Sequence, residues 1–209
     1  MSLLNKLFNF VMLTTKKYNI DESHGISHAM DILHFSSDIY KNEKIKNPLL
    51  ENHERIIYIS AILHDMCDKK YMNEKEGIES IEEFLKEKIP RNEIDITKKI
   101  ISTMSYSTVK KYGFPDLQEY QLAYHIVREA DLLCAYSIDR AIIYNIHKTN
   151  GNLTTAFDDT EKIFNNRIFK HFDDNLFVTD YSKDIALVLQ TQSLIRMNAW
   201  RGMVKNPIM

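Results

Sequence analysis

The sequence is poor in the residues that form turns. It holds 5 glycines and 4 prolines among 209 residues. A sheet-rich chain of this length needs more turn residues, so their scarcity favours long helices with short connections. Apolar residues also recur at helical spacing, as Leu3, Leu7, Phe10 and Leu13 do near the N-terminus. The sequence therefore predicts an all-α fold.

The expected helices follow one another along the whole chain, with breaks where glycine, proline or short polar stretches occur. They cover residues 2–18, 26–40, 49–66, 74–88, 91–104, 117–147, 155–172 and 180–199. No internal repeat, low-complexity tract or long linker divides the chain. We expect a single-domain helical bundle over 1–209. Its core lies at about 20–200, and the N-terminal helix 2–18 packs on it.

Composition and charge exclude several classes of protein. The formal charge of −2 and the pI near 6.4 argue against a broad nucleic-acid-binding face. No apolar stretch is long enough to cross a bilayer, and no cleavage site follows the first apolar segment. Cys67 and Cys134 provide no disulfide framework. We therefore expect a cytoplasmic protein, monomeric or homodimeric, with neither nucleic acid nor membrane as a partner.

Polar residues interrupt the apolar faces of three expected helices. His28 shares a face with Ile32, Phe35 and Ile39; His64 shares one with Ile57 and Ala61; and Asp131 lies between Val127 and Cys134. A buried carboxylate is costly unless it is paired or binds a metal. Each of these residues therefore needs a polar partner.

The pair His64–Asp65 is the most specific polar feature, because it directly follows the apolar run 56–63. Taken singly, such a histidine is usually a core residue bonded to a carbonyl, and such an aspartate caps a helix or pairs with arginine. Taken together, His28, His64, Asp65 and Asp131 form a mixed nitrogen and oxygen set, which suits a divalent ion such as Mn, Fe, Co, Ni or Zn. Adjacent helical residues point about 100° apart, so both members of the pair reach one ion only near a helix end.

The order His … His-Asp … Asp resembles the HD-domain phosphohydrolase superfamily. Ser23–His28 is similar to the opening H-x3-H segment of that family, and Ala61–Lys70 is similar to its A-x-L-H-D-x-x-D-x-K form. Arg128–Ala135, followed by Ile138–Ala141, resembles the segment around the last aspartate. The resemblance covers roughly residues 20–200. It points to the small bacterial-type branch that acts on nucleotides.

This resemblance implies a helical bundle of the HD type with one divalent metal ion, Mn, Fe, Co, Ni, Zn or Mg. The implied ligands are His28, His64, Asp65 and Asp131. The implied catalytic residues are Asp68, which orients or deprotonates the attacking water or protonates the leaving group, and Lys70, which neutralises a phosphate. Without the resemblance, the sequence would indicate only that Asp68 is a turn residue and that Lys70 is a solvated lysine in a loop.

Three more residues are candidates for substrate binding. His24 can meet the substrate or hold a ligand carboxylate, and Arg140 can reach a phosphate or form an ion pair near Asp139 or Glu129. Tyr106 can stack on a base or belong to the core. The remaining histidines are assigned no role in the site; these are His34, His53, His125, His147 and His171.

The segment around the last aspartate departs from the family pattern D-A-D-R-L-D-A. Leu132 stands at an arginine position of that pattern and Cys134 at an aspartate position. These departures bear on the choice of substrate more than on metal binding. The expected function is metal-dependent hydrolysis of a nucleotide or a related small phosphate ester or anhydride. The alternatives are a non-catalytic HD-like binding or regulatory module, and a structural or partner-binding protein whose ligand pattern is accidental.

Overall fold

The computed structural model describes residues 1–205, and residues 206–209 of the expected domain lie outside it. This part of the chain forms helices and turns and no strand, which confirms the predicted all-α class. The α-helices are α1 (Leu3–Tyr18), α2 (Ile26–Lys46), α3 (Glu54–Leu63), α4 (Glu74–Leu85), α5 (Arg91–Thr103), α6 (Tyr106–Tyr112), α7 (Gln121–Cys134), α8 (Ile138–Lys148), α9 (Leu153–Asn166) and α10 (Asp180–Lys205). The 3-10 helices are η1 (Glu22–His24), η2 (Pro48–His53), η3 (Gln118–Tyr120) and η4 (Ile168–Lys170). Within residues 1–205, no helix combines the length and the apolar character needed for a membrane crossing.

Short polar side chains determine where several helices begin and end. The Ser2 hydroxyl accepts a hydrogen bond from the Asn5 N–H at 3.3 Å, and the Ser137 hydroxyl accepts one from the Arg140 N–H at the same distance. Each satisfies an N–H group that the first turn of a helix leaves free. Asn19 ends α1 in the left-handed conformation with φ 51°, which asparagine tolerates better than most residues.

The expected helix over 117–147 is wrong as a single element. The chain forms α7, turns at Ala135–Ser137, and begins α8 at Ile138. Apolar residues continue at helical spacing from Cys134 to Ile138, so the periodicity does not reveal the turn. The seven-residue helix α6 was also not predicted, since a segment this short has little periodicity of its own.

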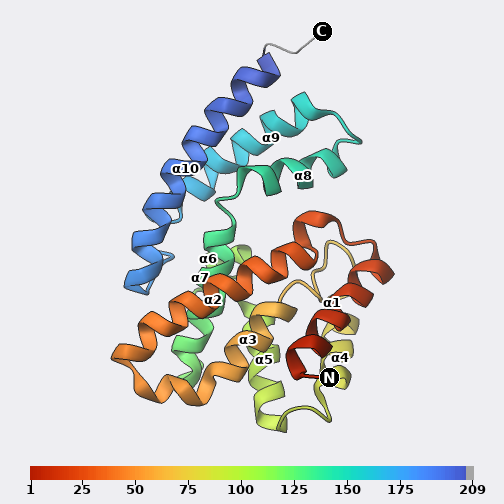
Figure 1. The fold of residues 1–209 in the computed structure, drawn as a ribbon, viewed down its shortest axis with the longest axis vertical. Coiled ribbons are helices and arrows are strands. Elements are labelled where there is room, and N and C mark those ends of the chain that lie inside the picture. Colours follow the sequence, from red (N-terminus) through yellow and green to blue (C-terminus); the bar gives the residue numbers. More distant parts are fainter. Residues whose placement is uncertain (206–209) are drawn as a thin grey trace.

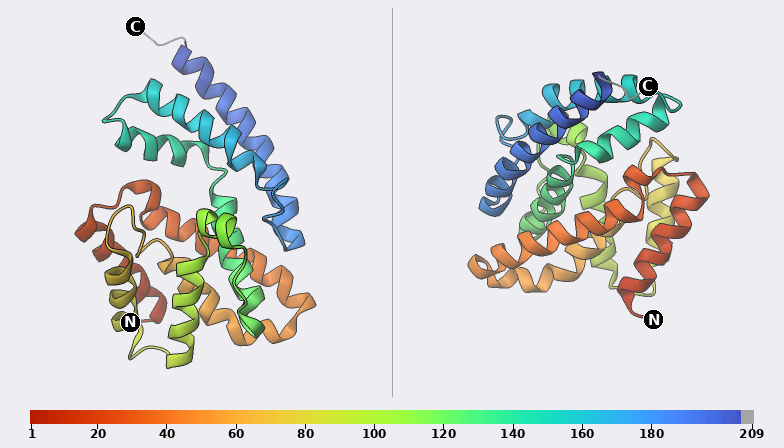
Figure 2. Two further views of the ribbon diagram at one scale, coloured as in Figure 1. Left: turned by 180° about the vertical axis from the view of Figure 1, so that it is seen from behind. Right: turned by 45° about the horizontal axis from the view of Figure 1, so that its top comes forward.

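Helix α2 crosses the middle of the molecule and packs against α3 and α7 (Figure 1). One apolar cluster joins α2, α3 and α7 to α8, α9 and α10. A second cluster joins α1, α4 and α5 to the other side of α3. Figure 2 shows the resulting arrangement, with α8–α10 at one end of the molecule and the N-terminal helices at the other. The beginning of α2 and the ends of α3 and α7 meet between these two groups.

Helix α4 approaches the segment after His64–Asp65 so closely that a side chain at Gly77 does not fit. A Cβ atom there would lie 2.7 Å from the Cys67 Cα. Gly77→Ala should therefore lower the free energy of unfolding by about 1–3 kcal/mol, although alanine is the better helix former. The control is Gly202→Ala in α10, where nothing lies within 4 Å of the added atom and a gain of about 0.5–1 kcal/mol is expected. Equal urea midpoints for the two variants would contradict the close approach.

Candidate metal centre

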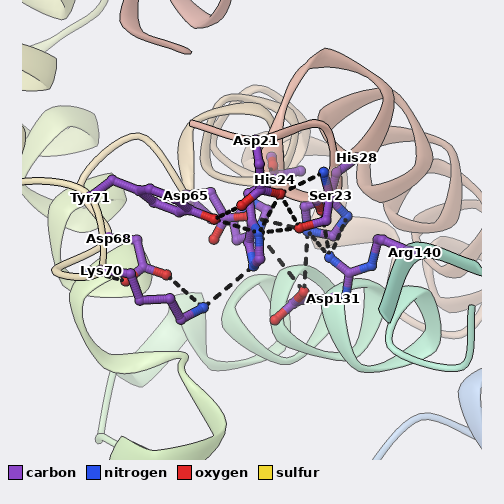
Figure 3. A network of polar contacts seen from close by, with 12 residues as sticks. Asp21, Ser23, His24, His28, Asp65, Asp68, Lys70, Tyr71, Asp131 and Arg140 are labelled. Carbon is purple, nitrogen blue, oxygen red and sulfur yellow. Dashed lines mark hydrogen bonds and ion pairs between the residues drawn. The ribbon is translucent and has the colours of Figure 1, made fainter. Parts of the chain in front are cut away.

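The side chains of His28, His64 and Asp65 converge from two helices. His28 lies in the first turn of α2, and His64 and Asp65 directly follow the last residue of α3. The α-helix ends at Leu63, short of the expected 66, so the pair lies at a helix end as the predicted ligand geometry requires. Both histidines are buried, with exposed fractions of 2% and 8%. Asp131 approaches them from the last turn of α7 (Figure 3).

The distances among these groups fit a single cation. One ligand atom from each of His28, His64 and Asp65 lies within 4.8 Å of the other two. Asp65 Oδ2 is 3.3 Å from the Nε2 atoms of both histidines. Asp131 Oδ1 lies 3.5 Å from His28 Nε2 and 3.9 Å from His64 Nε2. His28, His64 and Asp65 therefore form a cluster that can hold a metal ion, and Asp131 lies beside it.

Two atoms of the cluster have unused coordination capacity. His64 Nε2 and Asp65 Oδ2 are buried, and neither has a hydrogen-bond partner within the described part of the chain. Such atoms cost free energy unless something binds them. The other ring nitrogen, His64 Nδ1, lies 2.9 Å from the Ala61 carbonyl, which orients Nε2 toward the cluster. The donor set and its unpartnered atoms therefore fit a divalent ion.

The charges of the cluster depend strongly on one another. Burial opposes the charged form of His64, but the Asp65 carboxylate outweighs it and the pKa of His64 rises to about 9. Burial likewise opposes the charged form of Asp65, while His64 and His28 hold the pKa of that carboxyl well below its usual range. The pKa of Asp131 is lowered in the same way. Without a cation in the site, the proton on His64 compensates the carboxylates.

Metal binding should therefore release a proton at neutral pH. An ion can bind His64 Nε2 only after the proton has left, so affinity should rise about tenfold per pH unit toward pH 9 and level off above it. Calorimetric titration of metal into metal-free protein, in buffers with different heats of ionisation, measures the released proton. Affinity that stays constant between pH 7 and pH 9 would contradict this coupling.

Asp68 and Lys70 lie at the edge of the cluster, in the turn after the ligand pair. Lys70 Nζ lies 3.0 Å from Asp68 Oδ2 and 3.4 Å from His24 Nε2. The Lys70 backbone N–H also donates to Asp68 Oδ1 at 2.9 Å. Burial opposes the charge on Lys70, but the Asp68 carboxylate raises the pKa of its ammonium group. Lys70 therefore presents a fixed positive charge beside the cluster.

His24 is held by residues that were not predicted as part of the site. Its Nδ1 lies 2.7 Å from the Ser23 hydroxyl and 3.0 Å from the Tyr71 hydroxyl. The Tyr71 hydroxyl donates to Asp21 at 2.6 Å, and the Ser23 hydroxyl also donates to Asp21. Burial opposes the charge on Asp21, but hydrogen bonds from His24, Ser23 and Tyr71 keep its pKa below the usual range. His24 is thus oriented through Nδ1, with Nε2 toward Lys70 (Figure 3).

Arg140 reaches the cluster from the first turn of α8. Its guanidinium donates to the Ser23 carbonyl at 3.0 Å and lies 3.2 Å from both ring nitrogens of His28. The alternative ion pairs are not formed, because Asp139 pairs with Arg196 and Glu129 pairs with Arg128. Arg140 therefore lies against His28 at the edge of the cluster.

Tyr106 is the predicted site residue that has no contact with the cluster among the interactions described. It begins α6, and its ring contacts the guanidinium of Arg167 and the ring of His171. Asp21 and Tyr71 were not predicted as residues of the site. Each lies within a few residues of His24 or Lys70 in the sequence, and this closeness could have identified them.

A scan of protein-family models and a search of curated proteins find no match to this chain. Among solved structures, the chain is similar to the crystal structure of a Lactobacillus plantarum protein from a structural-genomics programme. The two align with a TM-score of 0.71 over 97% of each chain, at 18% sequence identity. At this identity, the similarity shows a shared fold and nothing more.

Proposed function

We propose that the chain is a metal-dependent phosphohydrolase. The observation that carries the proposal is the buried His/Asp cluster with two unpartnered ligand atoms and fixed positive charges at its edge. His28, His64, Asp65 and Asp131 would hold one divalent ion; Mn, Fe, Co, Ni, Zn and Mg are the candidates. The order of these residues, which resembles the HD-domain phosphohydrolases, supports the same reaction.

The residues around the cluster would have different roles in the proposed hydrolysis. The chemistry that a divalent ion supplies here is a lower pKa for water and neutralisation of phosphoryl charge. Lys70 and Arg140 bind phosphate oxygens, since both present positive charge at the edge of the cluster. Asp68 pairs with the Lys70 ammonium and would orient the attacking water or take its proton. Water forms the new bond to phosphorus, and the leaving oxygen departs with a proton.

The proposed substrate class is a nucleotide or a related small phosphate ester or anhydride. The positive groups around the cluster support a phosphate, and the resemblance to the nucleotide-hydrolysing branch supports a nucleotide. The test uses the purified full chain with Mn, Fe, Co, Ni, Zn or Mg and a panel of nucleoside mono-, di- and triphosphates. Phosphorus NMR then identifies the product. Hydrolysis that depends on the added metal is expected, and no turnover of any substrate with any of these metals would exclude the enzyme.

Two adjacent lysines allow a controlled test of the phosphate-binding role. Both lysines are exposed, but Lys70 lies 3.0 Å from Asp68 and 3.4 Å from His24, whereas Lys69 has no ion pair among the described residues. Lys70→Ala should lower kcat/KM by about tenfold to a hundredfold, because a charge-assisted contact contributes roughly 1.5–3 kcal/mol. Lys69→Ala should change it by less than about twofold. Equal losses in both variants would show a general effect of the positive charge rather than a phosphate contact.

A further inference from the structure

His24 belongs to a network of hydrogen bonds directly beside the candidate metal centre (Figure 3). The centre of its ring lies 6.0 Å from that of His28, and Arg140 donates to the backbone carbonyl of Ser23 at 3.0 Å. The side chains of His24 and Asp21 are only 12% and 11% exposed. Because water has little access to this network, its polar atoms find their partners within the chain.

The Asp21 carboxylate accepts the protons of two neighbouring hydroxyl groups. Tyr71 donates to Asp21 Oδ2 at 2.6 Å, and Ser23 donates to Asp21 Oδ1. Burial opposes the charge on Asp21, but hydrogen bonds lower its pKa, so at neutral pH the group only accepts. Burial and the bond to Asp21 raise the pKa of Tyr71, so the phenol keeps its proton. Each hydroxyl has a single proton, and neither has one left for His24.

These contacts determine which proton His24 carries on Nδ1. That nitrogen lies 2.7 Å from the Ser23 hydroxyl and 3.0 Å from the Tyr71 hydroxyl. Since both hydroxyl protons point at Asp21, the two oxygens can only accept from the ring. Nδ1 forms a hydrogen bond here only if it carries a proton and donates it, and the network therefore selects the tautomer with the proton on Nδ1.

The other side of the ring leads independently to the same tautomer. His24 Nε2 lies 3.4 Å from Lys70 Nζ, and an ammonium group has three donors and no acceptor. A proton on Nε2 would point one donor at another, whereas a free lone pair accepts a hydrogen bond from Lys70. Lys70 Nζ also lies 3.0 Å from Asp68 Oδ2. These two contacts use two N–H groups of the ammonium, and the third is available for a ligand.

We propose that Asp21 is a positioning residue that fixes the tautomer of His24 and, through His24 Nε2, the ammonium group of Lys70. The ligand that this arrangement serves rests on the proposed function: Lys70 presents its remaining N–H to a phosphate oxygen of the substrate. His24 itself supports Lys70 and does not bind the phosphate, because Nδ1 donates to a hydroxyl and Nε2 accepts from Lys70.

Nitrogen-15 NMR of the full chain, labelled in its histidine rings, measures the tautomer without any ligand. In the unmodified chain at neutral pH, Nδ1 of His24 should be protonated and Nε2 unprotonated, and His24→Gln identifies these signals by their loss. Asp21→Asn should move the proton to Nε2, because its NH₂ group donates to a hydroxyl oxygen and redirects that hydroxyl's proton to Nδ1. Tyr71→Phe should keep the original tautomer, since Ser23 still connects the ring to the carboxylate. The matched control is Asp173→Asn, an exposed carboxylate between η4 and α10.

A protonated Nε2 in the unmodified chain would overturn the proposal, and this result does not depend on the folding of any variant. A folded Asp21→Asn protein that keeps the proton on Nδ1 would also overturn it. Asp21→Ala is the second variant: it removes the acceptor of both hydroxyl protons, so the same change of tautomer is expected.

The effect on Lys70 is measured by calorimetric titration of inorganic phosphate at one fixed Mg²⁺ concentration. Loss of a negative charge would by itself strengthen the binding of an anion. Asp21→Asn should instead weaken phosphate by about threefold to tenfold, because Lys70 loses one of the acceptors that hold it. In a Lys70→Ala background the same substitution should change the affinity by less than about twofold.

Stronger phosphate binding in Asp21→Asn, or equal weakening with and without Lys70, would overturn the positioning role. The tautomer and the phosphate affinity are separate measurements. An unmodified chain that binds no phosphate, but whose tautomer responds to Asp21→Asn as expected, would contradict the proposed function and support the role of Asp21 toward His24.

Discussion

Replacing Asp65 with asparagine should remove the metal ion and the hydrolytic activity together. Asp65 Oδ2 lies 3.3 Å from the Nε2 atoms of both histidines and is buried without a hydrogen bond. Asparagine has nearly the same shape but brings no negative charge to the ion. We expect the affinity for divalent metal to fall by more than about a hundredfold and kcat to fall at least as far, because loss of a directly coordinating group exceeds the cost of losing a supporting one.

Metal analysis of the purified variant measures the loss, and circular dichroism confirms that the helices remain. The control is Asp158→Asn, which changes an exposed carboxylate in α9 and should leave both metal content and activity unchanged. An Asp65→Asn protein that still carries one ion per chain would show that the cluster is not the metal site. Loss of the ion in both variants would point to nonspecific binding by surface carboxylates.

Replacing Glu129 with glutamine should produce a large loss of stability. Glu129 is fully buried and accepts hydrogen bonds from the Val178 N–H at 2.7 Å and the Thr179 hydroxyl at 2.6 Å. It also lies 3.2 Å from the buried guanidinium of Arg128. Glutamine cannot neutralise Arg128, and an unpaired buried charge costs about 3–5 kcal/mol. We therefore expect the free energy of unfolding, measured in urea, to fall by that amount.

This loss should also loosen the start of α10, because Thr179 directly precedes that helix and its hydroxyl accepts the Ser182 N–H at 3.3 Å. Glu79→Gln is the control; its carboxylate is exposed and lies 3.9 Å from Lys75, so a change below about 0.5 kcal/mol is expected. A decrease of less than about 1 kcal/mol for Glu129→Gln would mean that Arg128 finds another partner or water when the carboxylate is removed.

Most of the helical architecture could be predicted because it depends on local sequence. Helices α4 and α5 begin and end close to the expected positions, since Asn73 caps one and Pro90 precedes the other. The turn at Ala135–Ser137 could not be predicted, because apolar spacing continues through it. That turn nevertheless affects the composition of the candidate site. Because of it, α8 runs in a different direction from α7, and Arg140 in the first turn of α8 contacts His28.

The candidate ligand residues were recognisable from the sequence by itself, because polar groups on apolar faces must find partners inside the fold. The sequence therefore determined the all-α class and singled out His28, His64, Asp65 and Asp131. Only the tertiary structure decided which cations surround them. Arg140 lies 112 residues beyond His28 and belongs to another helix, so no spacing rule connects the two. Their proximity depends on how α8 packs against η1, just before α2, and that packing is set by contacts between residues far apart in sequence.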